Sequence, residues 1–305
     1  MEGSFRYNDI TMRLGTNLLY QSPPGKICGV FEGSDHIVGP DDLLDAFGTL
    51  GQLGFEHVEL GADMFMYDAA LMSARFMERL GRKQRELDLS VSLHLSEYFG
   101  VMLESLDEDV RRASVTSSLK AIRAVRPLDV EHVVVHINGA WPWATLIVDD
   151  DPEFPKSAKV KLMERIVEQS RKSLHALIEE VPARTICLEN LLTDFQGTAR
   201  LAEEFDTSLC FDGGHWARIG RPLVEFVAEY GDRIGLVHCH DVRDGVDHRS
   251  LSSGPDDTPV LEWEAALKAL ADKEFDGPVV LELYGLDNKV RSLKYLQRLR
   301  RNYEG

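Results

Sequence analysis

Residues 236–254 read "LVHCHDVRDGVDHRSLSSG", a stretch in which His238, His240 and His248 are interleaved with aspartates. Neutral imidazole nitrogens and carboxylate oxygens are the ligands that divalent zinc, manganese and iron prefer in proteins. A solvated, charged loop is the alternative interpretation, because histidine and aspartate are both ordinary loop residues. The stretch taken alone leaves both interpretations open.

Further donors of the same kind stand at the ends of short apolar segments elsewhere in the chain. Six consecutive segments each contribute one: His94, His136, Glu189, Asp212, His238 and Glu282. His215, in "DGGH", and His248 follow closely behind two of them. A single histidine in such a place most often has a hydrogen-bonded structural role. Carboxylates and imidazoles directed at one small volume would repel one another or become protonated, so six of them predict a bound cation.

Eight short β-rich segments alternate with longer amphipathic stretches and must position these donors. The segments are 12–20, 57–63, 90–96, 132–138, 185–190, 208–214, 234–241 and 278–285. Strict alternation of this kind predicts a parallel sheet, and eight units predict that it closes into a (β/α)₈ TIM barrel formed by a single domain, residues 1–305. A doubly wound open sheet is the alternative, but neither GxGxxG nor a P-loop follows any of the segments.

The alternation of side chains within the segments predicts which residues point into the barrel. His94 lies on the opposite face from Val91 and Leu93, and Glu59 and His238 have the same relation to their own apolar neighbours. The polar residues therefore gather on the inner face and late in each strand. In a barrel that position is the carboxyl-terminal mouth, where active sites of this fold lie.

Composition excludes several classes of function. A net charge of −17 argues against bulk nucleic acid as the main partner, because neutralising phosphates needs a basic face. No window approaches the ~18 consecutive apolar residues of a membrane span, and the first residues contain no apolar signal region. The four cysteines lack CxxC spacing and are expected to be reduced and structural. We expect a soluble cytoplasmic protein that binds no membrane, and its oligomeric state stays open.

Two long loops are expected at the barrel mouth, residues 19–40 after the first strand and 139–156 after the fourth. Loops of this length without structure of their own are usually lids or binding elements, and these two fit a bulky substrate. Trp141 and Trp143 in the second loop can offer flat apolar surface to a ligand. They can equally anchor the loop on the barrel rim.

The order of the donors resembles that of the xylose isomerase-like superfamily over nearly the whole chain. That superfamily includes sugar isomerases and epimerases and also endonuclease IV-type hydrolases. The resemblance to the first branch implies one divalent ion on Glu189, Asp212, His238 and Glu282, with the two glutamates exchanging protons at adjacent sugar carbons.

The resemblance to the hydrolase branch implies additional ions. His94 and His136 would hold one together with the bridging Glu189, and His215 and His248 another. The Asp-x-His pattern of that branch is displaced by one position here, where Asp247 directly precedes His248. We therefore expect one to three ions of Zn, Mn, Fe or Co.

Four strings resemble one family within the superfamily, the cobamide-remodelling phosphodiesterases. They are "RRASV" with "RPLD", "CLENL", "SLCFDGGHW" and "VRDGVDHRSL". This resemblance implies a metal-dependent phosphodiesterase that cleaves the nucleotide loop of a cobamide to cobinamide phosphate and a lower-base riboside.

The same resemblance implies roles for particular residues. The expected catalytic residues are Glu189, Glu282, Asp241 and His248, and the expected substrate contacts are Arg243, Arg249, Trp141 and Trp143. The two arginines would clamp phosphate oxygens, unless they are ordinary surface arginines. The alternative function is a divalent-metal-dependent sugar or sugar-phosphate isomerase or epimerase, and in either case the partner is a small-molecule substrate. DNA repair is disfavoured by the negative charge, and a non-catalytic binding barrel by the intact donors.

Overall fold

Eight parallel strands close into a barrel in the computed structural model, which describes residues 12–18, 39–96, 100–137, 156–192, 195–251 and 258–302. The barrel runs in the order β1-β2-β3-β4-β5-β6-β7-β10, and β10 pairs with β1 to close it. The strands are β1 (Arg13–Leu18), β2 (His57–Gly61), β3 (Ser90–His94), β4 (His132–Val135), β5 (Ile186–Glu189), β6 (Ser208–Asp212), β7 (Ile234–Cys239) and β10 (Pro278–Leu281). The predicted (β/α)₈ barrel is thereby confirmed, with each strand inside its predicted segment.

Strand register brings the predicted donors to one end of the barrel. β6 and β7 pair so that Asp212 lies beside His238, and β5 and β6 pair so that Glu189 lies beside Cys210. Glu282 directly follows the last residue of β10. Because all eight strands run in parallel, these carboxyl-terminal positions meet at a single mouth.

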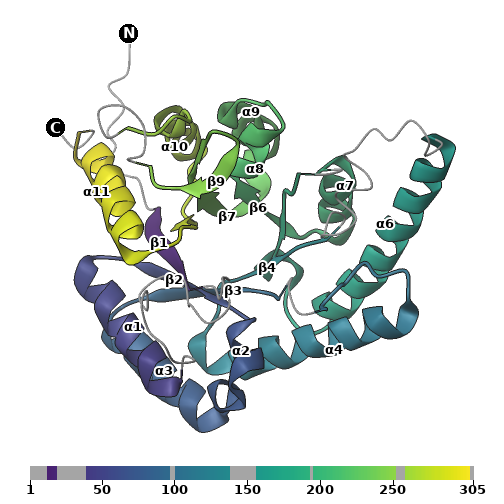
Figure 1. Ribbon diagram of the computed structural model, residues 1–305, viewed down its shortest axis with the longest axis horizontal. Coiled ribbons are helices and arrows are strands. Elements are labelled where there is room, and N and C mark those ends of the chain that lie inside the picture. Colours follow the sequence, from purple (N-terminus) through teal and green to yellow (C-terminus); the bar gives the residue numbers. More distant parts are fainter. Residues whose placement is uncertain are drawn as a thin grey trace.

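Helices surround the strands, as Figure 1 shows. They are α1 (Pro40–Leu53), α2 (Met64–Tyr67), α3 (Ala74–Glu86), α4 (Glu108–Ala124), α6 (Lys156–Ile178), α7 (Phe195–Phe205), α8 (Gly213–Arg218), α9 (Leu223–Tyr230), α10 (Trp263–Asp272) and α11 (Leu286–Asn302). Short 3₁₀ turns cover Ala69–Met72, Arg126–Leu128, Ala183–Thr185 and Gly231–Arg233. Among the helices described, none is long and apolar enough to span a bilayer.

Local sequence explains where these helices begin and which face they bury. α3 begins after Ser73, whose hydroxyl accepts from the Phe76 backbone N–H, and it buries Phe76, Met77 and Leu80 against the barrel. An N-cap of this kind satisfies one of the free N–H groups of the first turn. The apolar residues recur at helical spacing, so one stripe of the helix covers the sheet while the charged face meets solvent.

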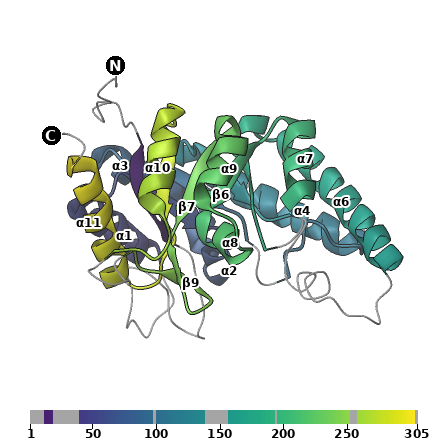
Figure 2. The ribbon, with the colours of Figure 1, turned by 90° about the horizontal axis from the view of Figure 1, so that it is seen from above.

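A small hairpin lies at the barrel mouth. It belongs to the stretch 236–254, for which the sequence allowed two interpretations, a charged loop or part of a metal site. β8 (Asp241–Arg243) and β9 (Val246–Arg249) pair in antiparallel fashion across Asp244 and Gly245. Both turn residues have positive φ, 54° and 75°, which the Asp-Gly sequence favours. In Figure 2 the hairpin lies on the same side of the barrel as α2 and α8, which also follow strand ends. The predicted loops 19–40 and 139–156 lie almost entirely outside the described residues.

Candidate metal centre

Four predicted donors converge at the mouth of the barrel. Glu189 ends β5, Asp212 ends β6, His238 lies in β7 and Glu282 follows β10. One ligand atom from each lies within 4.8 Å of the others, and all four residues are buried. We call these four residues the metal centre.

Two atoms of the metal centre indicate that a cation belongs there. Among the described residues, His238 Nδ1 and Glu282 Oε2 are buried without a hydrogen-bond partner. The Nδ1 atom lies 3.3 Å from that oxygen, 3.4 Å from Glu189 Oε2 and 3.8 Å from Asp212 Oδ2. Buried polar atoms without partners cost free energy unless they share an ion. Three carboxylates and an imidazole suit a divalent metal, so the residues present fit one.

His94 and His136 both contact the Glu189 carboxylate, next to which the resemblance to the hydrolase branch also placed them. His136 Nε2 lies 2.9 Å from Oε2, and His94 Nε2 lies 3.4 Å from the same oxygen. His94 Nδ1 donates to the carbonyl oxygen of Leu95 at 2.9 Å, which leaves Nε2 facing the carboxylate. The two imidazoles therefore stand on one side of the metal centre and share one of its oxygens.

The carboxylate charges at the barrel mouth are balanced by protons on the neighbouring imidazoles. Burial opposes the ionisation of Glu189, but the charges of His136 and His238 outweigh it and hold the pKa of that carboxyl well below its usual range. Burial also opposes the protonation of His94, yet the hydrogen bond to Glu189 raises its pKa to about 9. For His215 burial is likewise outweighed, by the charge of Asp212, and the pKa rises to about 9. Protonated His94 and His215 thus place positive charge beside the carboxylates, where a bound cation would otherwise provide it.

A second cluster, His215, Asp247 and His248, forms the rim of the mouth and is called the rim cluster below. Its ligand atoms lie within 4.8 Å of one another and its side chains are partly exposed. The hairpin brings Asp247 to the cluster although its sequence position departs from the expected Asp-x-His spacing. His248 Nδ1 donates to the Glu282 carbonyl oxygen at 3.1 Å, so the rim cluster adjoins the metal centre.

Sequence reasoning missed two buried residues that contact the metal centre, Glu59 and His240. Glu59 Oε1 lies 3.0 Å from His238 Nε2, and His240 Nε2 lies 3.0 Å from Asp212 Oδ2. Both side chains are fully buried. The alternation of side chains already placed Glu59 on the inner face of its strand. A search for donors at strand ends passed over them, because Glu59 lies in the middle of β2 and His240 beyond the end of β7.

The other predicted site residues have different surroundings. The Asp241 carboxylate is buried and accepts from the backbone N–H groups of Val260 and Leu261, at 2.8 and 3.0 Å. These contacts are structural, and a catalytic role for Asp241 stays a prediction. Arg243 and Arg249 are exposed on the hairpin, where their role as substrate contacts also stays a prediction. Trp141 and Trp143 lie outside the described residues.

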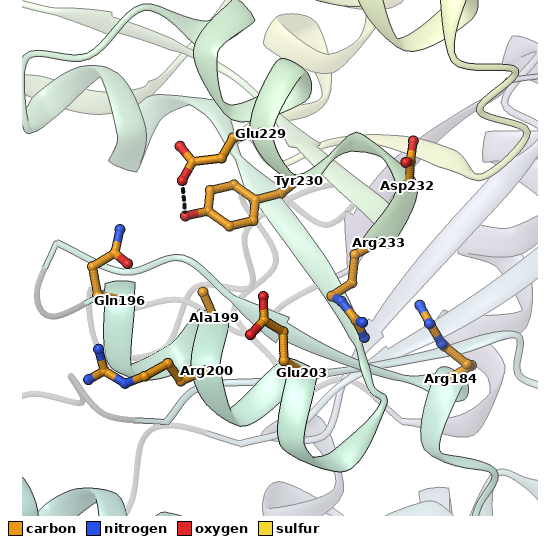
Figure 3. A pocket seen from close by; sticks show the side chains of 9 residues that line it. All are labelled: Arg184, Gln196, Ala199, Arg200, Glu203, Glu229, Tyr230, Asp232 and Arg233. Atoms are coloured by element: carbon orange, nitrogen blue, oxygen red, sulfur yellow. Dashed lines mark hydrogen bonds between the residues drawn. The ribbon is translucent and has the colours of Figure 1, made fainter.

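A groove of about 470 Å³ lies on the outside of the barrel, separate from the metal centre (Figure 3). Arginines and acidic side chains from α7, α9 and the turns before β5 and β7 line it. Arg184 and Arg233 in this groove both contact Asp206. The groove lies at the amino-terminal ends of β5 and β7, away from the metal centre, and its mixed charges indicate an ordinary solvated surface.

A closed barrel with buried carboxylates and an imidazole gathered at its mouth defines the class: a (β/α)₈ barrel with a candidate divalent-metal centre. Residues 48–300 match the family described as xylose isomerase-like TIM barrel, and the chain belongs to this family. No curated protein sequence matches the chain significantly.

Three solved structures illustrate the similarity. A D-tagatose 3-epimerase-like protein is 19% identical with a TM-score of 0.69, covering 96% of this chain and 98% of that one. D-Psicose 3-epimerase from Clostridium cellulolyticum H10 is 16% identical with a TM-score of 0.69, covering 96% and 99%. 3-Keto-D-glucoside 4-epimerase from E. coli is 17% identical with a TM-score of 0.66, covering 95% and 99%. At these identities the likeness establishes the shared fold.

The expectation of a phosphodiesterase that cleaves cobamides is wrong. The solved structures named above match the chain over nearly its whole length, and their names are those of two sugar epimerases and one epimerase-like protein. The physical reason for the error is that carboxylates and imidazoles at strand ends suit metal-dependent hydrolysis and metal-dependent isomerisation alike. Their order along the sequence therefore did not distinguish the two reactions.

Proposed function

We propose that this protein is a divalent-metal-dependent isomerase or epimerase of sugars or sugar phosphates. The observation that carries the proposal is the metal centre, where Glu189 and Glu282 offer carboxylate oxygens within 4.8 Å of each other and of the Asp212 and His238 ligand atoms. Their strands β5 and β10 are separated by β6 and β7 in the barrel, so the two carboxylates approach the centre from different directions. A substrate carbon bound there would have a proton acceptor on more than one side.

Proton transfer next to a carbonyl group requires this kind of pair. Moving a proton between adjacent carbons, or removing it from one face and returning it to the other, needs one base and one acid at fixed positions. Glu189 and Glu282 can exchange these functions, since each becomes the acid after it has accepted a proton. A bound divalent ion would supply Lewis-acid polarisation of the sugar oxygens next to the reacting carbon.

The proposed ligands of one ion are the four residues of the metal centre. We further propose that His94 and His136 stabilise the charge of Glu189 and that the rim cluster contacts substrate hydroxyl groups. Further ions at His94 and His136 with Glu189, and at His215 and His248, stay predictions. The identity of the metal among Zn, Mn, Fe and Co also stays open, because these ligands serve all four.

The names of the similar structures support the substrate class. Besides the three above, L-ribulose 3-epimerase is 15% identical with a TM-score of 0.66 and covers 96% of this chain. These names describe enzymes that act on carbohydrates by rearranging one carbon centre. Ketoses and keto-sugars are therefore the first substrates to test.

Solvent deuterium provides the most direct test. Protein purified without chelator would be assayed for metal content per chain and then incubated in D₂O with a panel of ketoses, aldoses and their phosphates. We expect the formation of an epimer or isomer together with deuterium at the reacting carbon, both lost on chelation and in Glu282→Gln. The matched control is Glu203→Gln, on the exposed face of α7. Metal-loaded protein that neither converts nor labels any member of the panel would overturn the proposal.

A further inference from the structure

Glu59 is a buried carboxylate near the metal centre that is not one of its four donors. Glu59 lies in the middle of β2, points into the barrel and is fully buried. Its Oε1 accepts from His238 Nε2 at 3.0 Å, and its Oε2 accepts from the Ser92 hydroxyl at 3.1 Å. An ionised group at this depth costs free energy unless donors surround it, and here both oxygens have one.

The contact between Glu59 and His238 crosses the interior of the barrel. β2 is separated from β7 by β1 and β10 in the strand order, and the two residues are 179 positions apart in the chain. β2 and β3 pair so that Glu59 and Ser92 are direct neighbours. The carboxylate is therefore held by its neighbouring strand while it reaches across to the imidazole.

Hydrogen bonds behind Glu59 hold it in this orientation. Ser92 Oγ lies 2.9 Å from His57 Nε2, and His57 Nδ1 lies 2.7 Å from Ser90 Oγ. Burial lowers the pKa of His57 to about 3, so its ring is neutral and has one proton to donate. Because the Ser92 hydroxyl proton is directed to Glu59, the Ser92 oxygen accepts from His57 Nε2–H. The hydrogen bonds therefore run from His57 through the Ser92 hydroxyl to the Glu59 carboxylate.

Glu59 determines which nitrogen of His238 faces the metal centre. With the Nε2 proton donated to the carboxylate, the remaining nitrogen of a neutral ring is Nδ1, which lies 3.3 to 3.8 Å from oxygens of the three carboxylates. A carboxylate that accepts from the far nitrogen of a ligating histidine fixes its orientation and increases its basicity.

We infer that Glu59 is a positioning residue, which through its hydrogen bond to Nε2 directs His238 Nδ1 to a divalent ion and strengthens its binding. The inference rests on the metal centre of the proposed function. Glu59 touches no substrate and acts only through His238.

Metal affinity measured without substrate tests the inference. Chelator-treated protein would be titrated with Co²⁺ and followed by calorimetry and by the visible absorption of the bound ion. Glu59→Gln keeps the size of the side chain and removes its charge, and we expect about ten- to hundredfold weaker Co²⁺ binding with an altered absorption spectrum. The control is Glu56→Gln, which changes a half-buried carboxylate three residues away that contacts Arg300. We expect that variant to bind Co²⁺ as the wild-type protein does.

The outcomes separate the inference from the proposed function. Equal Co²⁺ affinity and an unchanged spectrum in Glu59→Gln would overturn the inference and leave the metal centre intact. A wild-type protein that binds no Co²⁺ would overturn both. If Glu59→Gln fails to fold, NMR of ¹⁵N-histidine-labelled, Zn²⁺-loaded wild-type protein decides, with the His238 signals assigned through His238→Gln. A protonated Nε2 and a metal-bound Nδ1 support the inference, whereas Nε2 coordination contradicts it.

Discussion

His240 Nε2 lies 3.0 Å from Asp212 Oδ2, and both side chains are fully buried. The other ring nitrogen, Nδ1, accepts from the backbone N–H of His248 at 3.0 Å, so Nε2 carries the proton and donates it to the aspartate. The ring thereby joins the hairpin to one carboxylate of the metal centre. A substitution that displaces the His240 ring should therefore disturb both the hairpin and the metal centre.

Gly214→Ala provides such a change without altering any donor. A Cβ at this position would lie 2.0 Å from His240 Cε1, so the imidazole must move. We expect a free energy of unfolding lower by about 1–3 kcal/mol and a marked loss of metal affinity. Denaturant unfolding and Co²⁺ titration measure the two effects. Gly48→Ala in α1, where the new Cβ meets only the flexible Lys83 side chain at 3.7 Å, is the control and should leave metal binding unchanged.

Glu189→Gln should remove activity while preserving the fold. The carboxylate contributes to the metal centre and contacts the imidazoles of His94, His136 and His215. Loss of the proton-transfer group alone is expected to lower kcat by about 10²- to 10⁴-fold. Circular dichroism and gel filtration would check the fold, and steady-state assays the rate. Activity at the wild-type level in this variant would contradict metal-centre catalysis.

Chelator-treated protein should lose stability as the pH rises from about 6.5 to about 9. The pKa of His94 and that of His215 are each raised to about 9 in the folded state from an ordinary value of 6.5. A raised pKa means that the folded state binds the proton more tightly, so this contribution is complete below pH 6.5 and disappears as pH passes 9. Thermal unfolding of chelated protein between pH 6 and 9.5 measures it. We expect Tm to fall over this range, and less so in His94→Gln.

Metal binding at neutral pH should release protons. In the metal-free protein the raised pKa values keep His94 and His215 protonated at pH 7, and an incoming cation repels these charges. Calorimetry in buffers of different ionisation enthalpy would detect the release, and affinity should increase as pH rises towards 9. Heats that do not depend on the buffer would contradict this account of the charge balance.

The amino-acid sequence by itself determined the barrel and the gathering of the strand-end donors at its mouth. Strand segments and amphipathic stretches follow from local periodicity, and all eight predicted strands are present. Alternation within each strand put His94, Glu189 and His238 on inner faces near the carboxyl-terminal ends. These predictions succeeded because a parallel barrel brings every strand end to the same mouth, whatever lies between the strands.

Only the tertiary structure decided which donors contact one another. Glu59 reaches His238 because the sheet closes, and the hairpin brings Asp247 and His248 to His215. In both cases the residues that meet lie far apart in the chain. The structure also shows that the buried Asp241 carboxylate accepts from the Val260 and Leu261 backbone N–H groups, while its expected catalytic role stays a prediction. Local periodicity determines the direction in which a side chain points. The partner it meets depends on strand order, register and closure, which arise only when the whole chain has folded.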